Sequence, residues 1–171
     1  MKTIKNQLDD WDGKSADFLK RVYAEFAETG TFLDEVLRLS RESRFQNAAT
    51  WLLKHHLDEG NSITATQRST IIRELKSLQE WEAKLHVLQC LPRLSLTRRE
   101  ADQTVRFLRV CVDDANKFVR AWAYGGFHIV ALQHPNFRDE SEQRLAWAIE
   151  NEAPSVRARL RQVLHQKPKS G

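Results

Sequence analysis

The chain lacks the sequence features of several common protein classes. Its 171 residues contain only two cysteines, Cys90 and Cys111, which is too few for a disulfide framework or a four-cysteine zinc site. No stretch approaches the roughly 18 apolar residues that span a bilayer, and the first residues lack the apolar run of a signal peptide. These absences predict a cytoplasmic protein without a membrane segment, whose two cysteines pack in the core.

Motifs that mark catalytic centres are missing as well. The sequence has no HExxH metal motif, GxSxG nucleophile elbow, phosphate-binding loop or dinucleotide-binding glycine pattern. His55 and His56 are adjacent, and neighbouring residues of a helix point about 100 degrees apart, which makes a poor metal chelate. We therefore expect no cofactor, no metal and no catalytic residue, and we disfavour a metalloenzyme or a nucleotide hydrolase.

A recurring apolar block is the main positive signal. The blocks begin at Phe45, Trp81, Val119 and Val156, so their starts are 36, 38 and 37 positions apart. Such spacing is typical of helical repeats, because each repeat buries its apolar face only by stacking on its neighbours. No segment shows the sustained alternation of a half-buried strand. The sequence thus predicts an all-α fold with about nine helices and no sheet.

Residues able to cap helices precede the apolar stripes. Thr97, with Glu100 three positions later, has the spacing of a capping box. The other expected caps are Ser15, Thr31, and Thr64 or Thr66. Taken in order, the helices form one amino-terminal helix followed by four hairpins within a single repeat domain, 1–171. We place the hairpins at about 31–58, 64–91, 97–132 and 139–166, with a basic tail at 167–171.

The third hairpin contains the segment DANKFVRAWA, in which Asp114 lies six positions before Arg120. This arrangement of aspartate, turn, valine-arginine and alanine resembles HEAT-like α-solenoid proteins. The first two hairpins lack the valine-arginine pair, and Asn151 stands where the fourth would have its aspartate. The segments WLLKHHL, WEAKLHVLQ and FVRAWAYGGF are also similar to small uncharacterised bacterial HEAT-like proteins. The resemblance implies a superhelix of about four antiparallel hairpins, whose second helices line a concave face, and it implies no activity.

Positive charge accumulates toward the carboxy terminus. Residues 1–96 hold 14 Lys and Arg against 14 Asp and Glu, whereas residues 97–171 hold 13 against 9. Positions two, six and ten of each block share one helical face, so a concave face built from them becomes more basic along the chain. A basic surface attracts acidic proteins or nucleic acid. The predicted partner-binding residues on this face are His86, Arg120, Tyr124, His128, Arg157, Arg161 and His165.

Some of these residues also have a structural interpretation. Arg120 and Asp114 are expected to form an ion pair that joins neighbouring parts of the stack. Gly125 and Gly126 fall inside a helix, where each glycine costs roughly 1 kcal/mol relative to alanine. We interpret the two glycines as a place where another helix, or a ligand, approaches closely.

Two functional hypotheses follow. The first is a noncatalytic interaction module or scaffold that binds a protein partner, favouring an acidic one, on the concave face. The alternative is a nucleic-acid-binding protein resembling HEAT-like alkylpurine DNA glycosylases, which use a basic groove with aromatic residues and a carboxylate. The residues that would serve such a groove are Arg120, Trp122, Tyr124, Arg157 and Arg161, with Asp113 or Asp114 as the acid.

Overall fold

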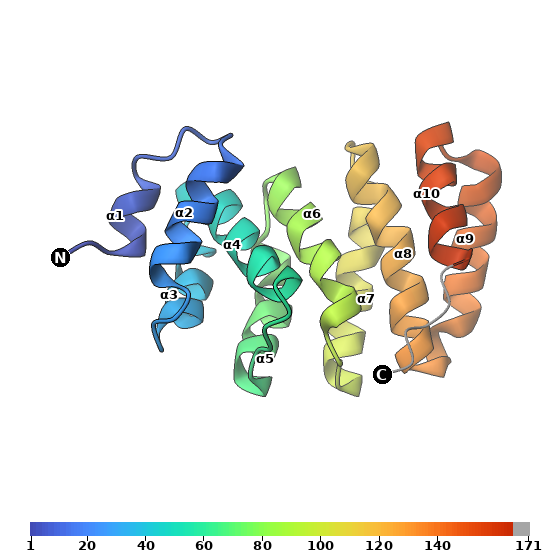
Figure 1. The fold of residues 1–171 in the computed structure, drawn as a ribbon. Coiled ribbons are helices and arrows are strands. Elements are labelled where there is room, and N and C mark those ends of the chain that lie inside the picture. The colour runs from blue at the N-terminus through green and yellow to red at the C-terminus, as the bar shows by residue number, and fades with distance from the viewer. Residues whose placement is uncertain (166–171) are drawn as a thin grey trace. The chain divides into compact units, whose positions relative to one another are not determined.

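The structure, a computed structural model, describes residues 1–165, and within them every regular element is a helix (Figure 1). The α-helices are α1 (Ile4–Leu8), α2 (Ala16–Phe26), α3 (Phe32–Leu39), α4 (Gln46–Asp58), α5 (Ala65–Glu74), α6 (Trp81–Cys90), α7 (Arg98–Cys111), α8 (Lys117–Gln133), α9 (Arg138–Asn151) and α10 (Pro154–His165). The short 3-10 turns are η1 (Ser43–Phe45), η2 (Leu75–Ser77), η3 (Leu91–Arg93) and η4 (Pro135–Phe137). The prediction of an all-α fold is confirmed for this part of the chain.

Local capping explains where several helices begin. Thr64 and Thr97 each form a complete capping box, with Gln67 and Glu100 at the third helical position. Each box satisfies backbone N–H groups that the first turn leaves without a partner inside the helix. Ser15 accepts a hydrogen bond from the Phe18 N–H, as predicted. The caps at Ser15, Thr64 and Thr97 therefore fix the starts of α2, α5 and α7. The prediction for Thr31 is wrong, because its side chain makes no capping hydrogen bond before α3.

The described residues contain one helix more than the nine expected. This helix, α1, has five residues, and its buried apolar side chains are Ile4 and Leu8, one turn apart. The Thr3 side chain accepts a hydrogen bond from the Asn6 N–H. Two apolar residues are too few to make a periodic pattern in the sequence, so α1 depends on the helices against which it packs.

The chain divides into two compact units, and the first comprises Met1–Arg93. Here α3 packs against α4 and α5, while α4 packs against α2 and α6. The largest fully buried side chains of this unit are apolar, among them Phe32, Leu39, Leu52 and Leu88. Most of the helix contacts in this unit are thus made by α3 and α4.

The second unit is Leu94–Gly171, in which α8 is the central helix. It packs against α7, α9 and α10, and α9 also packs against α10. Val119, Ala123, Phe127 and Val130 of α8 are fully buried, and Leu160 of α10 is buried equally completely. Because α8 has neighbours on three sides, much of its surface is removed from solvent.

The structure bears on two predictions, the packing of the two cysteines in the core and the absence of a membrane segment. Cys90 and Cys111 are both buried and form no disulfide, as predicted from their number and spacing. None of the helices within residues 1–165 combines the length and apolar character needed to cross a bilayer. The cytoplasmic localisation and the single repeat domain stay predictions.

Candidate functional site

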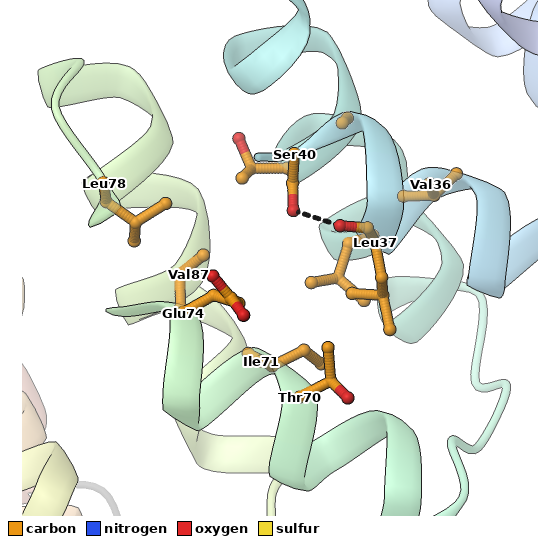
Figure 2. Close-up of a pocket in the computed structure, with 11 residues that line it drawn as sticks. Val36, Leu37, Ser40, Thr70, Ile71, Glu74, Leu78 and Val87 are labelled. Atoms are coloured by element: carbon orange, nitrogen blue, oxygen red, sulfur yellow. Dashed lines mark hydrogen bonds between the residues drawn. The ribbon is translucent and has the colours of Figure 1, made fainter. Parts of the chain in front are cut away.

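The first unit contains a cleft, and its size and lining argue against a ligand site. Figure 2 shows Val36, Leu37 and Ser40 facing Thr70 and Ile71 across it. Its interior offers about 20 Å³ to the centre of a water molecule, and holding one water takes about 10–15 Å³. The lining is mostly apolar, and the Ser40 hydroxyl already donates to the Leu37 carbonyl oxygen at 2.8 Å. The small interior and the apolar lining give this cleft no feature of a ligand site.

In the first unit, the predicted contact face is used for packing between helices. Gln46 and Thr50 of α4 are buried, and the Thr50 hydroxyl lies 3.0 Å from Nδ1 of His86 on α6. Burial, aided by the charge of Lys54, lowers the pKa of His86 to about 4. The His86 imidazole is therefore neutral at physiological pH and joins α4 to α6.

In the second unit, the same face contains a buried polar cluster. Arg120 of α8 makes two hydrogen bonds to the Glu152 carboxylate, at 2.9 and 3.2 Å, and a third to the main-chain oxygen of Asp114 at 3.1 Å. Tyr124, which is buried, lies close enough to Glu152 for the two groups to interact. Burial and the Glu152 charge raise the pKa of Tyr124 to about 12. These contacts join α8 to the end of α9.

The carboxylate that Arg120 binds is thus Glu152, whereas the sequence predicted Asp114. Asp114 contributes its main-chain oxygen and an electrostatic attraction to Arg120, and its Oδ1 accepts a hydrogen bond from the Asn116 N–H at 2.8 Å. Glu152 lies 32 positions from Arg120 in the sequence, so no local motif indicates this pair. The predicted ion pair between neighbouring parts of the chain exists, with a different acid.

Gly125 marks a close approach between α8 and α10. An added Cβ at Gly125 would lie 3.6 Å from Cγ2 of Val163, which is ordinary van der Waals distance. Helix α10 therefore packs on α8 at this position, but it leaves room for a Cβ, so this packing does not require the glycine.

Alanine at position 125 is expected to stabilise the protein by about 0.5–1 kcal/mol, because it removes the helix penalty of glycine without a clash. The matched control is Gly60→Ala, since Gly60 has φ of +86°, which costs an alanine about 1–2 kcal/mol. Chemical denaturation of both variants checks the opposite signs. A destabilised Gly125→Ala variant would contradict the packing of α10 on α8.

The remaining predicted residues lie on or near α10. Arg161 and His165 are exposed, and Arg157 is half-buried. Arg157 and Arg161 form no ion pair with any described residue, and Nε of Arg157 is buried without a hydrogen-bond partner. His128 of α8 is half-buried, and burial lowers its pKa. The basic tail predicted at 167–171 lies outside the described residues.

One residue that the sequence analysis did not select is Arg159. Its guanidinium carbon lies 4.0 Å from the centre of the Trp122 ring, a cation–π contact between α10 and α8. Nε of Arg159 is buried without a hydrogen-bond partner, and burial lowers the pKa of this side chain. The sequence contains a signal for this contact, because Trp122 and Arg159 both occupy the fourth position of their blocks.

The histidines show no arrangement for metal binding in the part of the chain that the structure describes. Residues 1–165 contain no group of three or more His, Cys, Asp or Glu side chains placed to hold a metal ion. His55 stacks on Trp51, and Nδ1 of His56 lies 3.1 Å from the Tyr23 hydroxyl. Both members of the adjacent histidine pair therefore contribute to packing.

We use the name α8–α10 surface for eight of the exposed and half-buried side chains of α8 and α10, which are Phe118, Trp122, Ile129, Leu132, Arg157, Arg159, Arg161 and His165. Of the predicted site residues, the structure brings Arg157, Arg161 and His165 together on α10, whereas Arg120 and Tyr124 lie in the polar cluster beneath. No protein-family model, curated protein or solved structure shows a significant match to the chain.

Proposed function

We propose that the protein is a noncatalytic HEAT-like interaction module that binds an acidic segment of a protein partner on the α8–α10 surface. The observation that supports this proposal is the charge of α10. Its described residues include Arg157, Arg159 and Arg161 and no acidic side chain, and none of the three arginines forms an ion pair within residues 1–165. A cationic helix without its own counter-charge favours an anionic partner.

Three arginines elsewhere in the second unit provide a contrast. Arg120 binds Glu152, and Arg109 and Arg144 both bind Glu140 at 2.7–3.0 Å. The charges of these side chains are therefore neutralised within the chain, whereas the charges of the α10 arginines are available to another molecule.

The proposed architecture is an α-solenoid in which successive helix pairs stack. Support comes from the packing inside each unit. In the first unit, α3 contacts α4 and α5, and α4 contacts α6; in the second, α8 contacts both α7 and α10. Contacts between helices two positions apart in the chain are what stacked hairpins require.

Reversing two charges on α10 tests the proposal. The double variant Arg157→Glu, Arg161→Glu is expected to reduce the amount of a retained protein partner at least about tenfold, because each lost charged contact is worth about 1.5–3 kcal/mol. The measurement is affinity capture from lysate at two salt concentrations, with identification and quantification of the proteins retained by the wild type and lost by the variant.

The matched control is Arg98→Glu, Arg99→Glu, which makes the same charge change at exposed positions of α7. Equal retention by both double variants would contradict the proposed surface. A titration of labelled duplex DNA distinguishes the competing hypothesis, because neutralised phosphates predict a steep loss of affinity with salt. Tight, steeply salt-dependent DNA binding that the α10 variant abolishes would show that the partner is a nucleic acid and not a protein.

A further inference from the structure

An apolar stripe runs along the exposed side of α8. Phe118, Trp122, Ile129 and Leu132 follow one another at helical spacing, and Gly125 in the same row is buried. Phe118 and Leu132 expose 50% and 59% of their surface, and the other two side chains are half-buried. Large exposed apolar side chains that align in one row are typical of contact surfaces.

The stripe lies along the border with α10. Trp122 contacts Arg159, and Val163 lies 3.6 Å from where a Cβ on Gly125 would stand, so the middle of the row faces α10. Arg159 therefore borders the apolar stripe, and a molecule on the stripe lies within its reach.

Arg159 presents a defined donor at this border. The Arg159 guanidinium has no hydrogen-bond partner within residues 1–165. Its Nε is buried, whereas its two η nitrogens are not among the buried atoms. A guanidinium whose η nitrogens are open binds a carboxylate or a phosphate in a directed manner. Its stacking on Trp122 also holds the planar group in one orientation.

A second cation lies over an aromatic ring one turn earlier. Nζ of Lys117 is 5.5 Å from the centre of the Phe118 ring. Phe118 and Trp122 therefore each carry a cation over one face. Nucleic-acid bases bind by stacking on open aromatic faces, and the exposed Asp113 before α8 opposes a continuous line of phosphates. These features favour a peptide over a nucleic acid strand.

From this geometry we infer that the partner segment is an acidic amphipathic helix, whose apolar side chains cover the α8 stripe and whose carboxylate binds the η nitrogens of Arg159. This inference rests on the proposed function and specifies its partner. Trp122 and Arg159 are its specificity-determining residues, because together they recognise a carboxylate that lies beside an apolar side chain.

The test uses designed peptides and the intact protein. The probe is a labelled peptide of about 18 residues, long enough to form a helix, with leucines on one face and glutamates beside them. Its partner probe replaces every glutamate by glutamine. Fluorescence anisotropy is expected to show that Arg159→Gln weakens the acidic peptide about tenfold or more and leaves the glutamine peptide unchanged.

Further variants separate charge from geometry. Arg159→Lys keeps the charge but loses the planar donor pair, so it is expected to recover only part of the affinity. Trp122→Leu is expected to weaken both peptides, because it removes apolar contact area. The matched control, Arg138→Gln, removes an exposed arginine at the start of α9 and should leave both affinities unchanged. Thermal melting of each variant confirms that it is folded.

The outcomes distinguish this inference from the proposed function. If Arg159→Gln binds the acidic peptide as well as the wild type does, whereas the double reversal on α10 releases the captured partner, the inference is wrong and the proposed function stands. If neither the peptide titration nor the capture experiment gives its expected result, both the inference and the proposed function are wrong. Absence of peptide binding to the wild type, or binding of a labelled thymidine strand that Arg159→Gln weakens instead, also overturns the acidic helix.

Discussion

Alanine in place of Leu160 is expected to lower the free energy of unfolding by about 2–5 kcal/mol. Leu160 exposes 0% of its surface in the interior of the second unit. Truncation removes buried methyl groups and leaves a cavity that the surrounding helices fill only in part. Equilibrium denaturation of the variant and the wild type, followed by circular dichroism, measures the difference.

Leu164 provides a control from the same helix. It is the same type of residue one turn later in α10, but 39% of its surface is exposed. Leu164→Ala is therefore expected to destabilise the protein much less than Leu160→Ala. Equal effects of the two substitutions would show that α10 does not pack on the core as described. Leu85 has the same position in its block as Leu160 but is half-buried, so its truncation should have an intermediate effect.

Acidification is expected to destabilise the protein through His86. Burial lowers the pKa of His86 from 6.5 to about 4 in the folded chain. As the pH falls below 6.5, the unfolded chain takes up this proton first, so the free energy of unfolding decreases until the pH approaches 4. At 1.36 kcal/mol per pKa unit, the contribution lost over this range is about 3 kcal/mol. Stability is fully present above pH 6.5.

Comparison with His86→Gln isolates this contribution, because other histidines also titrate in the wild type. The variant should show a shallower loss of stability between pH 6.5 and 4, measured by denaturation at several pH values. Lys54→Gln should have a smaller effect in the same direction, since the Lys54 charge also lowers the pKa of His86. A directly titrated His86 with its ordinary pKa, observed by NMR, would contradict this expectation.

The sequence predicted most helices because their signals are local. Capping residues and apolar periodicity act within a few positions, so Ser15, Thr64 and Thr97 identified three helix starts correctly. Helix α1 was not predicted, because its stability depends on neighbouring helices. The candidate site was harder to predict, since a helical pattern shows which residues share a face and leaves open what covers that face.

Tyr124 and His86 illustrate this limit. Both belong to the face that the sequence assigned to a partner, yet Tyr124 is buried against Glu152 and His86 is bound to Thr50. Exposure depends on the crossing of helices that are about 30 positions apart in the chain, which no periodicity within one helix encodes.

By itself, the amino-acid sequence determined that the described chain is helical, where most helices begin, and that its positive charge gathers at the carboxy-terminal end. Only the tertiary structure decided which charges remain unpaired. Arg120 is neutralised by Glu152, whereas Arg159 lies on Trp122 without a carboxylate from residues 1–165. The reason is physical: charge neutralisation requires two side chains to meet within a few ångströms, and helix packing sets that distance.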